Sequence, residues 1–348
     1  KQTDTNKTVF GFNDGNGNTF SSFLISAAGT GPGSSLSRIF DVNISNPLNG
    51  QSLVYDSSNL KWTNQTISGG TSSSGGTSAN LWSASTGTNS IIANNSTGNL
   101  ASGTNSLVNG SGNTVIGVNS TVLGGQQNIT SGSNASIIAG SGNTVSGNNS
   151  FIGGGVRNRI SGTTSSVSAG SFIGAGSGNT TASLGSSIVG GSGNTINSTT
   201  SQYSVIGGGQ SNSMATSARA FIGSGALNTI TNGTHSFIGA GSGNSAIGVY
   251  SFIGGGQLNR IISPRSFVGG GSGNTLGSSS SHSSIVAGQS NTIASSTYSV
   301  VVGGRRNSLT SATQSFIGGG SGNTIPSGAY SVIVGGQSNR SRAGYSFI

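Results

Sequence analysis

The stretch SFIGGGSGNTI, residues 315–325, decides the fold because it recurs along the chain. Close copies are SFVGGGSGNTL at 266–276 and SFIGAGSGNT at 171–180. One such glycine run would suggest a phosphate-binding loop, but that loop needs a Lys-Ser/Thr pair at a set spacing and a helix that follows it. Repetition of the motif along the chain predicts a stacked repeat architecture instead.

Each copy of the motif contains an asparagine, and successive asparagines lie mostly 15 or 16 residues apart. A helical repeat needs about 30 residues or more, so a unit of this length holds two short strands and two turns. We therefore predict an all-β fold, a parallel β-solenoid with one coil per repeat. The fifteen asparagines are Asn113, Asn128, Asn143, Asn158, Asn179, Asn194, Asn212, Asn228, Asn244, Asn259, Asn274, Asn291, Asn307, Asn323 and Asn339.

Two apolar positions of the repeat predict the core. An aliphatic residue stands six positions before each asparagine, and in eleven of fifteen units an aliphatic residue or methionine stands two positions after it. Because strand side chains alternate, both residues are expected to face inward and to stack into two facing columns. The core members that we name are Ile152, Ile173, Ile206, Ile253, Ile317 and Ile325.

A glycine always stands three positions before the asparagine. We predict that it occupies a turn that requires positive φ or a close backbone approach. The asparagine is expected to form a ladder in which each side-chain amide bonds its equivalents in the coils above and below. Neither role requires a ligand. The representatives of this turn and ladder are Gly304, Gly320, Gly336, Asn274, Asn307 and Asn323.

A second apolar face lies seven and five positions before the asparagine. Position seven is phenylalanine in seven units, and position five is then glycine; where position seven is small, position five is bulky, as in Ser106 with Val108. This exchange of volume indicates close packing. Apolar strips mark association sites, so we predict a parallel homotrimer buried on this face, with a rounder monomeric solenoid as the alternative. The phenylalanines are Phe151, Phe172, Phe221, Phe237, Phe252, Phe267 and Phe316.

The early coils carry the motifs GTNSLV (103–108), GVNSTVLG (117–124) and GNNSFIGGG (147–155). These resemble the G-x-N-S repeats of YadA-like heads in trimeric autotransporter adhesins, over roughly residues 87–348. The repeat of this chain is longer than that of the family. The resemblance implies a left-handed, trimeric β-roll in which the aliphatic residues after the Asn-Ser pair are buried. In this chain those residues are Leu107, Val122 and Ile152.

The N-terminal part resembles a different kind of protein. Residues 41–66, DVNISNPLNGQSLVYDSSNLKWTNQT, look like a short β module found beside repeats in phage and large-virus fibre proteins. Its alternating pattern predicts two strands about a turn, with Leu53, Tyr55 and Trp62 in the core.

Three segments follow from these patterns. Trp82 is expected to cover the open end of the first coil, because terminal repeats need a cap. The Gly/Ser-rich composition of residues 67–80 predicts a flexible linker. The segments are an N-terminal β module at 1–66, the linker at 67–80 and the β-roll repeat domain at 81–348.

The charge pattern argues against chemistry in the roll. All four acidic residues lie in the first 56 positions, and ten Lys or Arg follow them, within a net charge of +9. Without carboxylates there is no acid–base pair, no Ser-His-Asp set and no calcium site, and without cysteine there is no thiolate site. We expect His235 and His282 to lie at different places in solvated loops. The sequence thus predicts no enzyme activity, no metal and no cofactor.

These observations together predict a mechanical function. We expect a structural or adhesive fibre protein that forms a rigid trimeric extracellular rod on a cell or virion surface. Its partners would be further copies of itself and a host-surface glycan or protein. The basic residues are too sparse to predict nucleic-acid binding, and no apolar run long enough for membrane insertion is present. The alternative is a filament-forming protein that polymerises end to end, because the final YSFI forms part of a further coil.

Overall fold

The computed structural model describes residues 7–10, 23–26, 42–43, 51–56, 58–66, 82–93, 97–162 and 170–348. The chain divides into two compact units, Lys1–Gly75 and Gly76–Ile348. The regular elements of the described residues are all strands, and none of these residues belongs to a helix that could cross a membrane. The segment boundaries at 66 and 80 stay predictions.

The first unit contains the predicted hairpin. Strand β4 (Gln51–Asp56) pairs antiparallel with β5 (Lys61–Thr66), and β3 (Val42–Asn43) pairs parallel with β5. Strands β1 (Lys7–Phe10) and β2 (Phe23–Ser26) form a separate antiparallel pair.

One core residue predicted for this hairpin is wrong. Trp62 is 41% exposed, so it does not lie in a core. A sheet of three strands is too small to cover both of its faces, which leaves such a ring in contact with solvent. The side chains of Leu53 and Tyr55 lie outside the described part of the chain.

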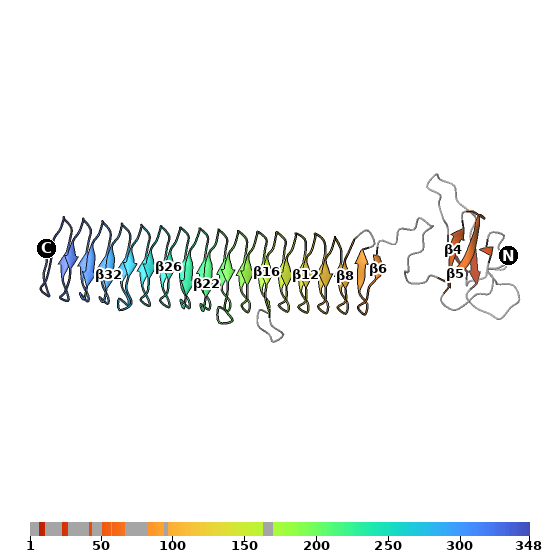
Figure 1. The fold of residues 1–348 in the computed structure, drawn as a ribbon, viewed down its shortest axis with the longest axis horizontal. Coiled ribbons are helices and arrows are strands. Elements are labelled where there is room, and N and C mark those ends of the chain that lie inside the picture. The colour runs from red at the N-terminus through yellow and green to blue at the C-terminus, as the bar shows by residue number, and fades with distance from the viewer. Residues whose placement is uncertain are drawn as a thin grey trace. The chain divides into compact units, whose positions relative to one another are not determined.

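The second unit is the predicted parallel β-solenoid, built from two long sheets (Figure 1). Consecutive coils pair in parallel and at the same repeat position, so that Ile253 lies opposite Val268. The first sheet consists of β8 (Leu100–Ala101), β10 (Thr114–Val115), β12 (Ile129–Thr130), β14 (Thr144–Val145), β16 (Arg159–Ile160), β18 (Thr180–Thr181), β20 (Thr195–Ile196), β22 (Ser213–Ala215), β24 (Thr229–Thr231), β26 (Ser245–Ala246), β28 (Arg260–Ile261), β30 (Thr275–Leu276), β32 (Thr292–Ala294), β34 (Ser308–Thr310) and β36 (Thr324–Ile325).

Single bridges from Thr97 to Gln337 form a third ladder. The second sheet includes the strands that carry the phenylalanines. Its strands are β7 (Ile91–Ala93), β9 (Leu107–Val108), β11 (Thr121–Val122), β13 (Ser136–Ile137), β15 (Phe151–Ile152), β17 (Phe172–Ile173), β19 (Ser187–Ile188), β21 (Val205–Ile206), β23 (Phe221–Ile222), β25 (Phe237–Ile238), β27 (Phe252–Ile253), β29 (Phe267–Val268), β31 (Ser284–Ile285), β33 (Val300–Val301), β35 (Phe316–Ile317) and β37 (Val332–Ile333).

A hairpin begins the solenoid. Strand β6 (Trp82–Ala84) pairs antiparallel with β7, and β7 pairs parallel with β9. The antiparallel strand therefore occupies the edge that a preceding coil would otherwise cover, which is one way to terminate a sheet. Trp82 lies in this strand and is 42% exposed. Its role as a cap over the core stays a prediction.

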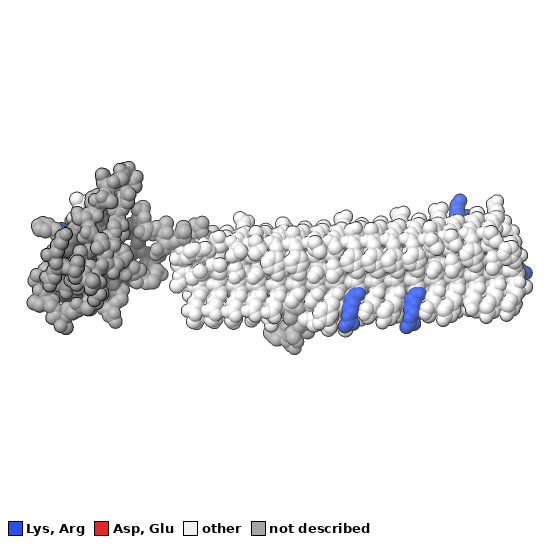
Figure 2. Space-filling view, turned by 180° about the vertical axis from the view of Figure 1, so that it is seen from behind, with Lys and Arg blue, Asp and Glu red and all other residues white. Residues whose placement is uncertain are grey.

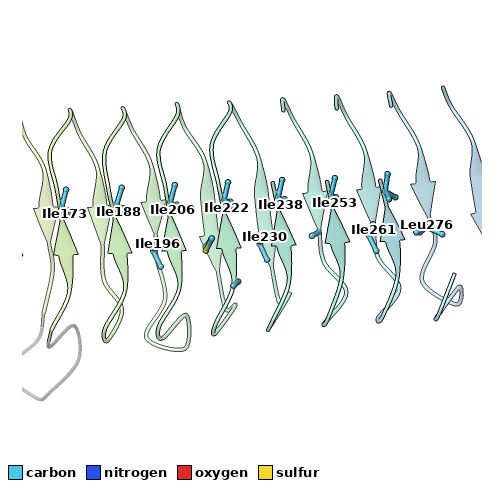
Figure 3. Packing of buried hydrophobic residues seen from close by; sticks show 14 of the residues in the cluster. Ile173, Ile188, Ile196, Ile206, Ile222, Ile230, Ile238, Ile253, Ile261 and Leu276 are labelled. Carbon is cyan, nitrogen blue, oxygen red and sulfur yellow. The ribbon is translucent and has the colours of Figure 1, made fainter. Parts of the chain in front are cut away.

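The core is one continuous cluster between the two long sheets. Figure 3 shows its two columns, with Ile206, Ile222 and Ile238 on one sheet and Ile196 and Ile230 on the other. Each of these side chains is fully buried, as close packing of two inward columns requires. The six named core residues, Ile152, Ile173, Ile206, Ile253, Ile317 and Ile325, are likewise fully buried.

The first complete coil departs from the predicted register. Leu107 pairs with Thr121 and Val108 pairs with Val122, so Val108 is the buried residue and Leu107 is only partly buried. This coil has one residue fewer between its strand and its turn. Counting back from Asn113 therefore placed Leu107 in the core wrongly, and it also paired Ser106 with Val108 on the outer face, although both are buried.

Candidate functional site

The regular spacing of glycine and asparagine in each coil builds a turn, not a ligand site. Gly304, Gly320 and Gly336 have φ angles of 82°, 80° and 88°, in the left-handed region. A Cβ atom at Gly320 would also clash with the carbonyl oxygen of Gly336 in the next coil. Both facts exclude a side chain at this position, because the coils approach each other by their backbones.

The asparagines form the predicted ladder, which combines amide-to-amide bonds in some coils with bonds to the backbone in all of them. Nδ2 of Asn274, for example, donates to Oδ1 of Asn259 over 3.1 Å, and three other coils make the same side-chain bond. The backbone N–H of Asn323 donates to Oδ1 of Asn307 over 3.0 Å. Its Nδ2 donates to the carbonyl oxygens of Gly319 in its own coil, over 2.8 Å, and of Gly336 in the next coil, over 2.9 Å. The side chain thus satisfies the turn carbonyls, which point at it, and links three coils. Asn274 and Asn307 make the same bonds to the backbone.

A second buried ladder, made of serines, was not predicted. The N–H of Ser251 donates to Oγ of Ser236 over 3.0 Å, and Oγ of Ser251 donates to the carbonyl oxygen of Ser263 over 3.0 Å. The serine stands eight positions before the asparagine, and alanine replaces it at 135 and 220. The sequence feature that indicates this ladder is the serine at the start of each SFI motif.

The phenylalanines lie on the outside of the second sheet, not in the core of a rounder solenoid. We call their column the phenylalanine strip. Its members on β27 and β29 stack with ring centroids 5.2 Å apart, and those on β25 and β27 stack at 4.8 Å. Four of the seven rings are 36–37% exposed and the other three are half-buried. The members are Phe151, Phe172, Phe221, Phe237, Phe252, Phe267 and Phe316.

A phenylalanine at one position of the strip goes with a glycine two residues later, and packing within a single chain explains this pairing. A Cβ atom at Gly254 would lie 3.5 Å from Cε1 of Phe252 and would clash with the carbonyl oxygen of Gly269. Each ring therefore lies beside the glycine of its own strand. Where the ring is absent, exposed aliphatic residues such as Leu123, Ile138 and Val286 continue the apolar surface. The strip is thus apolar along most of the solenoid.

The turn that precedes the second sheet forms a further outward column, which we call the turn column. It consists of the residue directly before each buried serine or alanine of the serine ladder. His235 and His282 both belong to it, so the prediction that they lie at different places is wrong. Their rings stack on Tyr250 and Tyr298, with centroids 4.9 Å apart in both pairs.

The remaining surface offers little chemistry. Among the described residues no group of three His, Cys, Asp or Glu side chains could hold a metal ion. Figure 2 shows the basic side chains of one face of the solenoid standing apart from one another, with no acidic side chain between them. No protein-family model matches the chain, and no curated protein sequence is similar to it.

Proposed function

We propose that this chain is the rigid, non-catalytic shaft of an extracellular structural or adhesive fibre, in which three parallel copies associate along the phenylalanine strip. The observation that supports this proposal is the strip itself. It is apolar and partly exposed along most of the solenoid, and exposed apolar surfaces of this extent mark association sites.

The area of the strip suits a stable interface. A phenylalanine ring with about 200 Å² of surface that is about one third exposed presents about 70 Å², so seven rings present about 500 Å². The aliphatic residues between the rings add to this area. A stable interface buries roughly 800 Å² on each partner, which the whole strip approaches.

The pattern of the strip favours a parallel arrangement. Phenylalanine coils and small-residue coils alternate unevenly along the chain, so only parallel copies bring each coil level with its own equivalent. The number of three rests on the simplest closed symmetry and on the resemblance to adhesin heads, and the left-handed sense of the coil rests on the resemblance alone; both stay predictions. About fifteen coils at about 4.8 Å would give a shaft about 70 Å long.

Light scattering of the purified chain tests the association. We expect a mass three times the 33.9 kDa of one chain. The triple variant F237S/F252S/F267S should be a monomer, and serine already occupies this position in other coils. The control L227G/L258G removes two leucines that are 62% exposed on another corner, where other coils have glycine, and should leave the mass unchanged. A monomeric wild type would contradict the association, and a trimeric triple variant would contradict the role of the strip.

Location and assembly need separate measurements. Immunogold labelling of the source cells or particles should place the protein at an outer surface, and labelling confined to the interior would contradict the extracellular proposal. The end-to-end filament also stays a prediction. Negative-stain electron microscopy separates it from the fibre, because discrete short rods support the fibre and indefinite filaments support the alternative.

A further inference from the structure

The turn column changes its character halfway along the solenoid. Its first five members are asparagines, which bond each other side chain to side chain over 3.0–3.2 Å. Two glycines follow at 170 and 185. The next ten coils carry aromatic, cationic or amide side chains instead. These ten members are Tyr203, Arg219, His235, Tyr250, Arg265, His282, Tyr298, Gln314, Tyr330 and Tyr345.

The backbone of this column is unfavourable for large side chains. All ten have φ angles between 51° and 60°, in the left-handed region, which glycine and asparagine adopt at the lowest conformational energy. The asparagines of the first half show that a less strained choice exists at the same position. Bulky residues in ten consecutive left-handed turns are therefore a strain that points to a use of these side chains.

Six rings of the column are stacked in pairs, so each of them covers one face against its partner and keeps its polar edge exposed. The pairs His235–Tyr250, His282–Tyr298 and Tyr330–Tyr345 are stacked with centroids 4.9–5.0 Å apart, and their planes are nearly parallel. The tyrosines of the column remain 48–82% exposed. Stacking thus fixes a row of phenol and imidazole edges, which supply hydrogen-bonding groups over about 40 Å of the solenoid axis.

The column also contains two cations without acidic neighbours. No Asp or Glu occurs after Asp56, so no carboxylate of the solenoid unit neutralises Arg219 or Arg265. The guanidinium carbon of Arg265 lies 5.7 Å from the ring centroid of Tyr250. The two arginines are three coils apart, roughly 14 Å along the axis. A guanidinium group binds a carboxylate or sulfate through paired hydrogen bonds.

We propose that this half of the turn column, residues 203–345, binds a linear acidic polysaccharide laid along the solenoid axis. The hydroxyls of the sugar chain would bond the tyrosine and histidine edges, and two of its carboxylates would bind Arg219 and Arg265. A nucleic acid fits less well, because its bases stack on free ring faces, and six rings of the column already cover one face against a partner. The inference rests on the proposed function, since it names the ligand class of an adhesive fibre.

Binding of the full chain to immobilised alginate, a polyuronate, tests the proposal. We expect retention that weakens with added salt, together with little retention on neutral dextran. The variants R219N/R265N and Y250N/Y298N introduce the asparagine that the same column already uses, so they should fold. Loss of the two arginines should weaken binding roughly tenfold or more. The control R305Q/R306G removes the same charge from another corner, where other coils have glutamine and glycine, and should bind like the wild type.

Several results would overturn the proposal. These are no retention on alginate, equal retention on dextran, tighter binding to oligo-dT, or an equal loss in the R305Q/R306G control, which would indicate nonspecific charge. Light scattering of the same samples keeps the two proposals apart. A monomer that binds alginate refutes only the trimer, whereas a trimer that does not bind it refutes only the polysaccharide site.

Discussion

Replacing Asn274 by alanine tests whether the asparagine ladder stabilises the stack of coils. Asn274 is fully buried, and its Nδ2 donates to the carbonyl oxygens of Gly270 and Gly288, each over 2.9 Å, and to Oδ1 of Asn259 over 3.1 Å. Its Oδ1 accepts the backbone N–H of Asn291 over 3.0 Å. Alanine removes these bonds and leaves their partners in place inside the solenoid.

The loss of stability depends on which partners of Asn274 keep another hydrogen bond after the substitution. The carbonyl oxygen of Gly288 still accepts the N–H of Ser272 over 2.9 Å, so it remains paired. The carbonyl oxygen of Gly270 and the N–H of Asn291 keep no other hydrogen bond among the described groups. The N–H of Asn291 is orphaned in a buried place, whereas the carbonyl oxygen of Gly270 is only partly buried and can bond water, and Oδ1 of Asn259 still accepts the N–H of residue 274. An orphaned buried group costs about 1–3 kcal/mol, so N274A should lower the free energy of unfolding by about that amount.

Urea denaturation followed by circular dichroism measures this free energy, and hydrogen-exchange mass spectrometry locates the effect. Because each coil contacts only its neighbours, protection should fall mainly in the coils on either side of residue 274. The control S290G exchanges a left-handed residue with a φ of 56° for the glycine of other coils and should be nearly neutral. An unchanged urea midpoint for N274A, or a protected amide at Asn291, would refute the reasoning.

Three further sets of variants test the packing by urea denaturation. T130V and T181V should each stabilise the chain by about 1 kcal/mol, because both threonine hydroxyls are buried with no hydrogen-bond partner among the described residues. A variant less stable than the wild type would contradict this expectation. G254V should cost about 1–3 kcal/mol, because its side chain would clash with the carbonyl oxygen of Gly269 and would crowd the ring of Phe252. Adding F252S removes the ring and should recover the second part of the loss, so equal stability of the single and double variants would show that the ring is not involved. S251A should lower the free energy of unfolding by about 1 kcal/mol, which is less than for N274A, because alanine already occupies this position in two coils. A larger loss than for N274A would show that the serine ladder stabilises the solenoid more than the asparagine ladder does.

Residues close to each asparagine were predicted well from the sequence. Ile317, Gly320 and Asn323 lie where their spacing placed them, because strand and turn geometry fixes positions over a few residues. Leu107 was misplaced because its coil lacks one residue, and a shift of one residue reverses inside and outside in a strand. The bond of Asn323 to the carbonyl oxygen of Gly336 was missed because it depends on the neighbouring coil, whereas its bond to Gly319 lies within one coil and was also missed.

The turn column was missed for a related reason. His235 stands seven positions after the preceding asparagine, and His282 stands eight after its own, because the loops between coils differ in length. Both stand nine positions before the next asparagine, which is the spacing that matters once the coils stack. Their shared column, and the tyrosines beside them, therefore became visible only in the structure.

The repeat period, the strands and the inward side chains follow from the sequence, because they depend on local alternation and on turn chemistry within one coil. The partners of each side chain follow only from the tertiary structure, because residues 15 or 16 positions apart in sequence become direct neighbours when the coils stack. The ladders, the phenylalanine strip and the turn column are all contacts between coils. Stacking converts one residue per repeat into a continuous surface, and the candidate binding surface exists only at that level.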